Sequence, residues 1–338
     1  MKCWFVRLPV LLLCFWLVPW ETPAPLVYRA GEGWTWEPVG GGKWTRLRAK
    51  DQLEVAEKAF EQKDYRLALK AARRTVRTWP LSDYAPKAQY LVGRCFEERR
   101  MDYKAFKEYQ NLIEKYPKSE TYNEVLNRQF AIANRYLAGQ WFKLLGYIPF
   151  FPSMERTVVM YEKLIKNGPY SEVAPQAQMN IGAAREKQRD YPQAVKAYEK
   201  AADIYHDQRS VEADAIYKAG LAYNKQARKA EYDQSIAAKA IGKFTDFIAL
   251  FPNEPRVPEA QQIIAALKTE QARGALQIAQ FYEKKRRWQS AMVYYNEVVV
   301  KDPNSSYATE AKQRMEVLKK RTEGPAADAT PSTSTPAS

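Results

Sequence analysis

Apolar and aromatic side chains recur three or four positions apart through most of the chain. In the segment 102–115 the apolar stripe consists of Tyr103, Phe106, Tyr109, Leu112 and Ile113. The segment 191–204 repeats this stripe with Tyr191, Val195, Tyr198, Ala201 and Ala202. Such spacing puts the apolar residues on one face of an α-helix, which then needs a neighbouring helix to bury them. The pattern predicts an all-α fold built of packed helices.

A proline ends most of the helical units, twelve residues after a small side chain. The pairs are Ala68 and Pro80, Ala105 and Pro117, Thr157 and Pro169, Ala240 and Pro252, and Ala291 and Pro303, while Ala194 and His206 have the same spacing. Proline stops a helix, and the serine that follows it in several units caps the next one. Gly93 and Gly182 stand where two helices are expected to approach closely.

These spacings follow the tetratricopeptide pattern, in which helix–turn–helix units stack into a solenoid. We count six units, at residues 50–80, 84–117, 121–169, 173–206, 210–252 and 257–303, and a capping helix at 306–320. The uneven distance between consecutive prolines places insertions in the third and sixth units and a smaller one near residue 230. The predicted domains are a signal peptide at 1–24, an extended or hairpin segment at 25–48, the repeat domain at 49–320 and a disordered tail at 321–338.

The first residues have the pattern of an export signal. Lys2 and Arg7 precede an uncharged apolar run from Leu8 to Trp20, which has signal-peptide length and is short for a bilayer span. An uncleaved anchor is the alternative. Cys14 follows leucines instead of the small residues that precede a lipidated cysteine, so the sequence leaves lipidation and the cleavage site open.

Two segments interrupt the helical pattern. Residues 26–46 are rich in strand-forming aromatic residues, with Gly40, Gly41 and Gly42 as the expected turn, and form either a clip on the first helix or an aromatic ligand site. The insertion at 141–152 either folds back over the repeats or forms an exposed patch for a partner or a membrane interface. The residues of that patch are Trp141, Phe142, Leu145, Tyr147, Phe150 and Phe151.

Composition argues against catalysis. His206 is the single histidine, and Cys95 is the single cysteine beyond the first twenty residues, which excludes multi-histidine and multi-cysteine metal sites and a disulfide framework in the body. The sequence contains no phosphate-binding glycine loop and no hydrolase motif. We expect no enzyme activity, no cofactor, no metal ion and no small-molecule substrate.

The net charge of +14 falls to +12 when Lys2 and Arg7 of the signal peptide are left out. On an exported protein this charge favours anionic lipid headgroups or acidic partners over nucleic acid. We expect contact with a membrane surface and no nucleic-acid partner.

The helical units resemble those of a known envelope family. The segments that carry the resemblance are Phe247-Ile248-Ala249-Leu250-Phe251-Pro252-Asn253, Ala279-Gln280-Phe281-Tyr282, Trp288 with Ala291, and Tyr294-Tyr295-Asn296-Glu297-Val298-Val299. They resemble the BamD-type lipoproteins of the outer-membrane β-barrel assembly machinery, over residues 50–318. The resemblance implies a non-enzymatic scaffold on the periplasmic face of the outer membrane, which binds periplasmic domains of the barrel insertase and unfolded barrel proteins. The alternative is another periplasmic tetratricopeptide adaptor, for example one that coordinates cell-wall synthesis with the envelope.

The concave face of a helical solenoid is the expected groove for partner proteins. Counted back from Pro117, the groove positions of the second unit are Lys87, Tyr90, Arg94 and Glu97. Neighbouring units contribute Asn127, Asn134 and Met179. The aromatic and arginine positions are expected to carry most of the binding energy.

Overall fold

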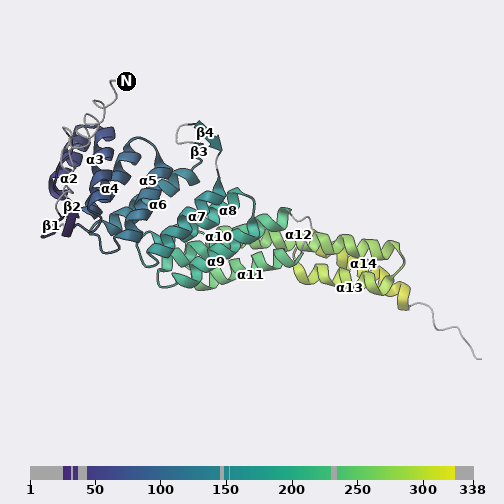
Figure 1. Cartoon of the computed structure of the whole chain (residues 1–338). Helices are drawn as coiled ribbons and strands as arrows, with labels where there is room; N and C mark the ends of the chain where they lie inside the picture. Colours follow the sequence, from purple (N-terminus) through teal and green to yellow (C-terminus); the bar gives the residue numbers. More distant parts are fainter. Residues whose placement is uncertain are drawn as a thin grey trace, which may run out of the picture. The chain divides into compact units, whose positions relative to one another are not determined.

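The computed structural model describes residues 26–31, 33–36, 44–144, 148–151, 153–229 and 234–323. Within these ranges the chain is a series of consecutively packed α-helices with two small β-hairpins (Figure 1). The predicted all-α repeat fold with an N-terminal aromatic hairpin is confirmed. The signal peptide and the residues of the tail beyond 323 lie outside the described residues.

Contacts between residues divide the chain into two units. Unit 1 extends to Ile132 and includes Phe142–Phe151, and unit 2 comprises Ala133–Trp141 and the residues from Pro152 onward. The helices and strands that begin in unit 1 are β1 (Leu26–Arg29), β2 (Gly33–Trp36), α2 (Ala49–Glu61), α3 (Tyr65–Thr78), α4 (Ala85–Glu98), α5 (Asp102–Lys115), α6 (Tyr122–Leu137), β3 (Phe142–Leu144) and β4 (Ile148–Phe151). The last five residues of α6 belong to unit 2.

Unit 2 continues the series of helix pairs. Its helices are α7 (Met154–Asn167), α8 (Ala174–Lys187), α9 (Tyr191–Ile204), α10 (Arg209–Lys229), α11 (Gln234–Leu250), α12 (Val257–Lys284), α13 (Trp288–Lys301) and α14 (Ser306–Glu323). The helix pairs follow the six units expected from the sequence, and α14 is the expected cap. The insertion of the sixth unit lies within α12, which at 28 residues is twice the length of α13.

The helix ends are set by local chemistry. The side chains of Asp64, Ser153 and Asp190 accept hydrogen bonds from the backbone of the first turn of α3, α7 and α9. Such caps satisfy amide groups that have no partner inside the helix. The turn within four of the pairs contains a residue with positive φ that is not glycine, namely Lys63, Arg100, Arg189 or Arg286.

The core of a pair is an aromatic ring packed on a small residue of the preceding helix. A Cβ atom added at Gly93 would lie 2.3 Å from Cε1 of Tyr109, and one at Gly182 would lie 2.3 Å from Cε1 of Tyr198. At Gly220 the distance to Cε1 of Phe244 would be 2.9 Å. The close approach expected at Gly93 and Gly182 is therefore present, and a larger side chain would displace a buried ring.

The sequence predicted the first of the two hairpins and not the second. In the first, the antiparallel strands β1 and β2 join through Ala30 and Gly31, while the turn expected at Gly40–Gly42 lies outside the described residues. The Gly31 carbonyl accepts hydrogen bonds from Ser82 Oγ (3.1 Å) and Asp83 N (2.9 Å), which fix the hairpin to the loop between α3 and α4. In the apolar insertion, β3 and β4 form an antiparallel pair that was not expected from the sequence.

Candidate partner-binding surfaces

The inner helices of unit 1 bring three of the predicted groove residues together. Tyr90, Arg94 and Glu97 lie along one face of α4 and meet Glu124 and Arg128 of α6. The Tyr90 hydroxyl donates to the Glu124 carboxylate and accepts from Arg128 Nε (3.0 Å) and Arg94 Nη1 (3.3 Å). Arg128 also pairs with Glu97 (3.3 Å). The result is a charged network that joins two neighbouring inner helices.

The contacts of this network favour a charged Arg128, an ionised Glu124 and a protonated Tyr109. Burial is the largest single effect and disfavours the charged guanidinium of Arg128, but the hydrogen bonds to Glu124 and Tyr90 and the electrostatic interactions with Tyr109 and Tyr90 together outweigh it, and the pKa of Arg128 is raised. Burial likewise opposes the hydrogen bonds from Tyr90 and Arg128, and these bonds still lower the pKa of Glu124. The pKa of Tyr109 is raised by burial and by the Glu97 carboxylate that accepts its hydrogen bond, so this phenol remains a donor at neutral pH.

Lys87 and Asn127 also lie on these two helices, and both are exposed. Sequence reasoning did not identify Glu124 and Arg128 as partners of the α4 residues. Their signal in the sequence is the acidic and basic pair four positions apart, which places both on one face of a helix.

A repeated contact explains the position of Glu97. In three pairs a buried tyrosine of the second helix donates to a glutamate of the first, from Tyr109 to Glu97 (2.8 Å), from Tyr198 to Glu186 (3.0 Å) and from Tyr295 to Glu283 (2.5 Å). A cation from the inner helix that follows pairs with the same carboxylate, namely Arg128, Lys225 and Arg314. These residues therefore link successive repeats, and Glu97 has a structural role within the groove.

The two groove positions predicted in unit 2 are already occupied by contacts within the protein. Asn134 accepts from the Tyr161 hydroxyl (2.6 Å) and from Asn180 Nδ2 (2.9 Å), as the glutamates do in the other pairs. Met179 is only 2 % exposed and packs in a core cluster with Ala194 and Tyr198. Its side chain has no surface to offer a partner.

The apolar insertion is only partly described. Trp141 is 51 % exposed, whereas Phe142 is 2 % exposed and packs edge-on against Tyr103, with 5.5 Å between the ring centroids. Phe142 is therefore a core residue and not part of a surface patch. Phe150 and Phe151 are part of β4, but their side chains are not described. Leu145 and Tyr147 lie outside the described residues.

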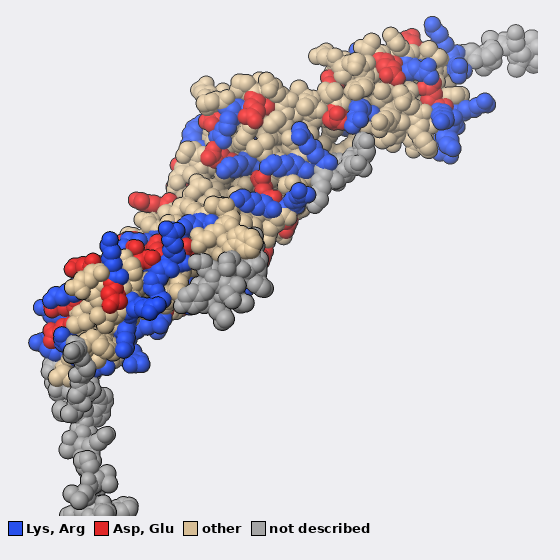
Figure 2. All heavy atoms as spheres, turned by 90° about the horizontal axis from the view of Figure 1, so that it is seen from above, with Lys and Arg blue, Asp and Glu red and all other residues tan. Residues whose placement is uncertain are grey.

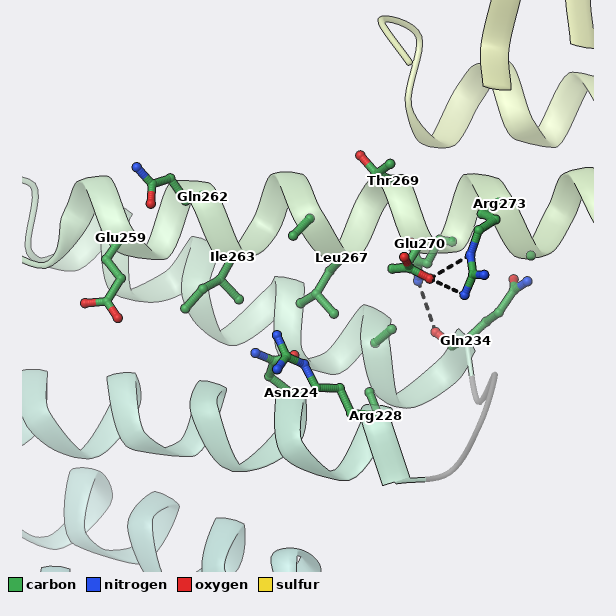
Figure 3. Close-up of a pocket in the computed structure, with 15 residues that line it drawn as sticks. Asn224, Arg228, Gln234, Glu259, Gln262, Ile263, Leu267, Thr269, Glu270 and Arg273 are labelled. Carbon is green, nitrogen blue, oxygen red and sulfur yellow. Dashed lines mark hydrogen bonds and ion pairs between the residues drawn. The ribbon is translucent and has the colours of Figure 1, made fainter. Parts of the chain in front are cut away.

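Unit 2 contains a cleft that was not foreseen from the sequence. It has a volume of about 1000 Å³ and lies where α10, α11 and α12 meet (Figure 3). Ile263, Leu267 and Ala237 give it apolar lining. Its polar residues are Asn224, Arg228, Gln234, Glu259, Gln262, Thr269, Glu270, Gln271 and Arg273.

Two contacts within the protein lie at the end of the cleft formed by Gln234 of α11 and residues 270–273 of α12. Gln271 Nε2 donates to the Gln234 carbonyl (3.1 Å), and Glu270 pairs with Arg273 (2.7 Å), as the dashed lines in Figure 3 show. In Figure 3, Asn224 and Arg228 of α10 lie on the side of α12 to which Ile263 and Leu267 point, whereas Gln262 points to the other side. Amide side chains beside apolar residues suit a ligand with both backbone amides and apolar side chains.

Asn224 is the most informative residue of this cleft. It lies four positions after Gly220, as Glu97 follows Gly93 and Glu186 follows Gly182. The ring packed on Gly220 is Phe244, which has no hydroxyl group to donate. Asn224 is 8 % exposed, and within the described residues its amide makes no hydrogen bond. The amide lines the cleft and is not among the buried polar atoms that lack a partner, so a ligand can bond to it in place of solvent.

Comparison with known proteins places the cleft inside a recognised domain. Residues 153–302 match the YfiO family, described as an outer membrane lipoprotein, and residues 87–119 match a tetratricopeptide repeat family. The YfiO match covers less than half of the chain. The resemblance to BamD-type tetratricopeptide proteins is thereby confirmed, and the match falls on unit 2. Both families are protein-interaction scaffolds, and this is the function class of the chain.

Several solved structures of tetratricopeptide proteins are similar to the chain at low identity. The C-terminal part of a repeat protein from Cytophaga hutchinsonii has 14 % identity and a TM-score of 0.36, with 78 % of this chain and 87 % of that chain covered. A tetratricopeptide protein from Parabacteroides merdae has 12 % identity and a TM-score of 0.30, with 80 % and 98 % covered. YrrB, described as having an unusual peptide-binding site, has 14 % identity and a TM-score of 0.33, with 64 % and 92 % covered.

No curated protein matches the sequence. Among the described residues, none of the helices combines the length and the apolar character that crossing a bilayer requires.

Proposed function

We propose that the protein is a BamD-type scaffold on the periplasmic face of the outer membrane, which binds the barrel insertase and extended segments of unfolded barrel proteins. The observation that carries this proposal is the cleft around Asn224, because all of its lining residues lie within the YfiO match. The function class of the matched families supports a non-enzymatic role.

The cleft suits an extended barrel segment for a physical reason. Barrel strands alternate apolar and polar side chains along about ten residues. An unpaired strand offers free backbone donors and acceptors, which the Asn224 amide in the lining of the cleft can bond. Apolar side chains of the same strand can pack on Ile263 and Leu267. Binding would keep both kinds of group from aggregating.

Peptide binding tests the cleft. We expect a synthetic peptide with the alternating pattern of a barrel strand to bind the full chain, and Asn224→Ala to weaken binding by about tenfold, the loss of one buried hydrogen bond. Asn296 is exposed on α13, so Asn296→Ala is the matched control and should bind like the wild type. Equal affinities of Asn224→Ala and the wild type, measured by fluorescence anisotropy, would remove the cleft as the peptide site.

Purification from native membranes tests the barrel-assembly role separately. We expect the barrel insertase to be recovered with the full chain. Recovery of cell-wall enzymes without the insertase would instead support the periplasmic adaptor and overturn the proposal. The exposed edge of the unit 1 groove, Lys87 and Asn127, remains a proposed second contact for protein partners.

A further inference from the structure

One face of α3 is a continuous basic stripe. The helix contains five basic residues and no acidic residue. Arg66, Lys70, Arg73 and Arg77 are spaced four, three and four positions apart, which puts them on one side of the helix over about 16 Å. All four side chains are exposed. In Figure 2 many Lys and Arg side chains lie at the N-terminal end of the face that it presents, with Asp and Glu side chains among them.

Acidic neighbours neutralise little of this stripe. Arg73 pairs with Glu108 of α5 (2.9 Å). Within the described residues, Arg66, Lys70 and Arg77 form no ion pair. The helix α5, which contains Glu108, also contains the basic residues Lys104 and Lys107. Unbalanced exposed cations repel one another, so an anionic surface that approaches them is attracted.

One aromatic ring packs on the stripe, and two exposed rings lie on the hairpin that is fixed to the loop after α3. Lys70 lies over the Trp44 ring, with 4.3 Å between Nζ and the ring centroid. The hairpin attached to the loop after α3 carries Tyr28 and Trp34, which pack against each other across the strands and are 61 % and 68 % exposed. Tyrosine and tryptophan are the side chains that partition to the headgroup layer of a bilayer.

We propose that unit 1 docks on an anionic lipid surface through Arg66, Lys70 and Arg77 of α3, with Tyr28 and Trp34 in the headgroup layer. Charge complementarity identifies the lipid class as one with negatively charged headgroups. The aromatic pair favours a lipid surface over an acidic polypeptide, because a purely ionic contact has no use for exposed aromatic rings. The inference does not depend on which proteins bind the cleft of unit 2.

Vesicle binding tests the inference. The full chain is mixed with vesicles of phosphatidylcholine and with vesicles of phosphatidylcholine and phosphatidylglycerol, and bound protein is measured by flotation. The apolar N-terminal run can bind both kinds of vesicle, so the measured quantity is the preference for the anionic ones. We expect a clear preference in the wild type that is lost in about 1 M salt, where the screening length is about 3 Å.

The decisive variant replaces Arg66, Lys70 and Arg77 together by glutamine. The three lost charges together should lower the preference by about a hundredfold. Arg66→Lys with Arg77→Lys keeps the charge and should keep the preference, because a lipid surface does not require guanidinium geometry.

The matched control removes three charges from another exposed helix. Lys312→Gln, Lys319→Gln and Lys320→Gln on α14 lower the net charge equally and should leave the preference unchanged. Circular dichroism of both triple variants verifies folding. An unchanged preference in the α3 variant, or an equal loss in the α14 control, overturns the proposal. Polyglutamate is the second probe. If the α3 variant loses binding to polyglutamate but keeps its preference for anionic vesicles, the proposal is overturned and the stripe is assigned to an acidic polypeptide.

Discussion

Replacement of Gly182 by alanine tests how tightly the repeat pairs are packed. The new Cβ atom would lie 2.3 Å from Cε1 of Tyr198, well inside contact distance. The ring has little freedom to move away, because Tyr198 is 2 % exposed and its hydroxyl bonds to Glu186. Accommodation therefore requires α8 and α9 to separate or the hydroxyl to leave its partner.

The sign of the effect distinguishes packing from helix propensity. Propensity alone predicts that alanine stabilises a helix interior by about 1 kcal/mol relative to glycine. Overpacking a core costs about 1–3 kcal/mol, and loss of the Tyr198 hydrogen bond adds about 1 kcal/mol. We therefore expect Gly182→Ala to lower the free energy of unfolding by about 1–3 kcal/mol after the gain in propensity.

Gly242 provides the matched control in the same unit. It lies inside α11, and an added Cβ would meet no atom within 4 Å, so Gly242→Ala should stabilise by the propensity term of about 0.5–1 kcal/mol. Urea denaturation followed by circular dichroism gives both changes, and hydrogen exchange of α8 and α9 reports the local effect if repeats unfold separately. A Gly182→Ala protein at least as stable as the wild type would refute the packing argument.

Three further outcomes follow from the structure. Tyr198→Phe removes one donor to Glu186 and should cost about 1–3 kcal/mol in urea denaturation, whereas Tyr170→Phe, at an exposed ring, should cost nothing measurable. The pKa of Glu124 is lowered, so its contribution to the free energy of unfolding is present above the unfolded-state pKa and is lost as the pH falls through the folded-state pKa. Glu124→Gln should therefore make the melting temperature depend less on pH in that acidic range, which thermal melts at a series of pH values measure. Burial raises the pKa of Cys95 to about 12, so alkylation located by mass spectrometry should be slow in the native chain and fast in urea; rapid native labelling would contradict its burial.

The repeat fold was predictable because its determinants are local. A proline or a cap residue stops or starts each helix, and an aromatic residue packs on a small one at fixed spacing, as with Tyr109 and Gly93. These signals need no knowledge of distant contacts. They gave the helix pairs and the close approach at Gly93 and Gly182.

The binding surfaces were less predictable because they depend on partners from other helices. Tyr90, Arg94 and Glu97 were expected to be groove residues, but the sequence did not show that Arg128 would bond to Tyr90 and Glu97. Met179 was placed in the groove by counting, and the packing of the next helices buries it. The apolar run after Trp141 contains no turn residue pair that would have distinguished a hairpin from a patch.

The cleft arises where the repeated contact between tyrosine and carboxylate is interrupted, and one substitution can restore that contact. Phe244 packs on Gly220 as Tyr198 packs on Gly182, so Phe244→Tyr directs a hydroxyl toward Asn224. The new hydrogen bond should stabilise the protein by about 0.5–1.5 kcal/mol and occupy the amide that the proposed peptide would use. We expect a higher urea midpoint together with weaker binding of the barrel-strand peptide. If Phe244→Tyr is stabilised and still binds the peptide like the wild type, the Asn224 amide is not the group that holds the ligand.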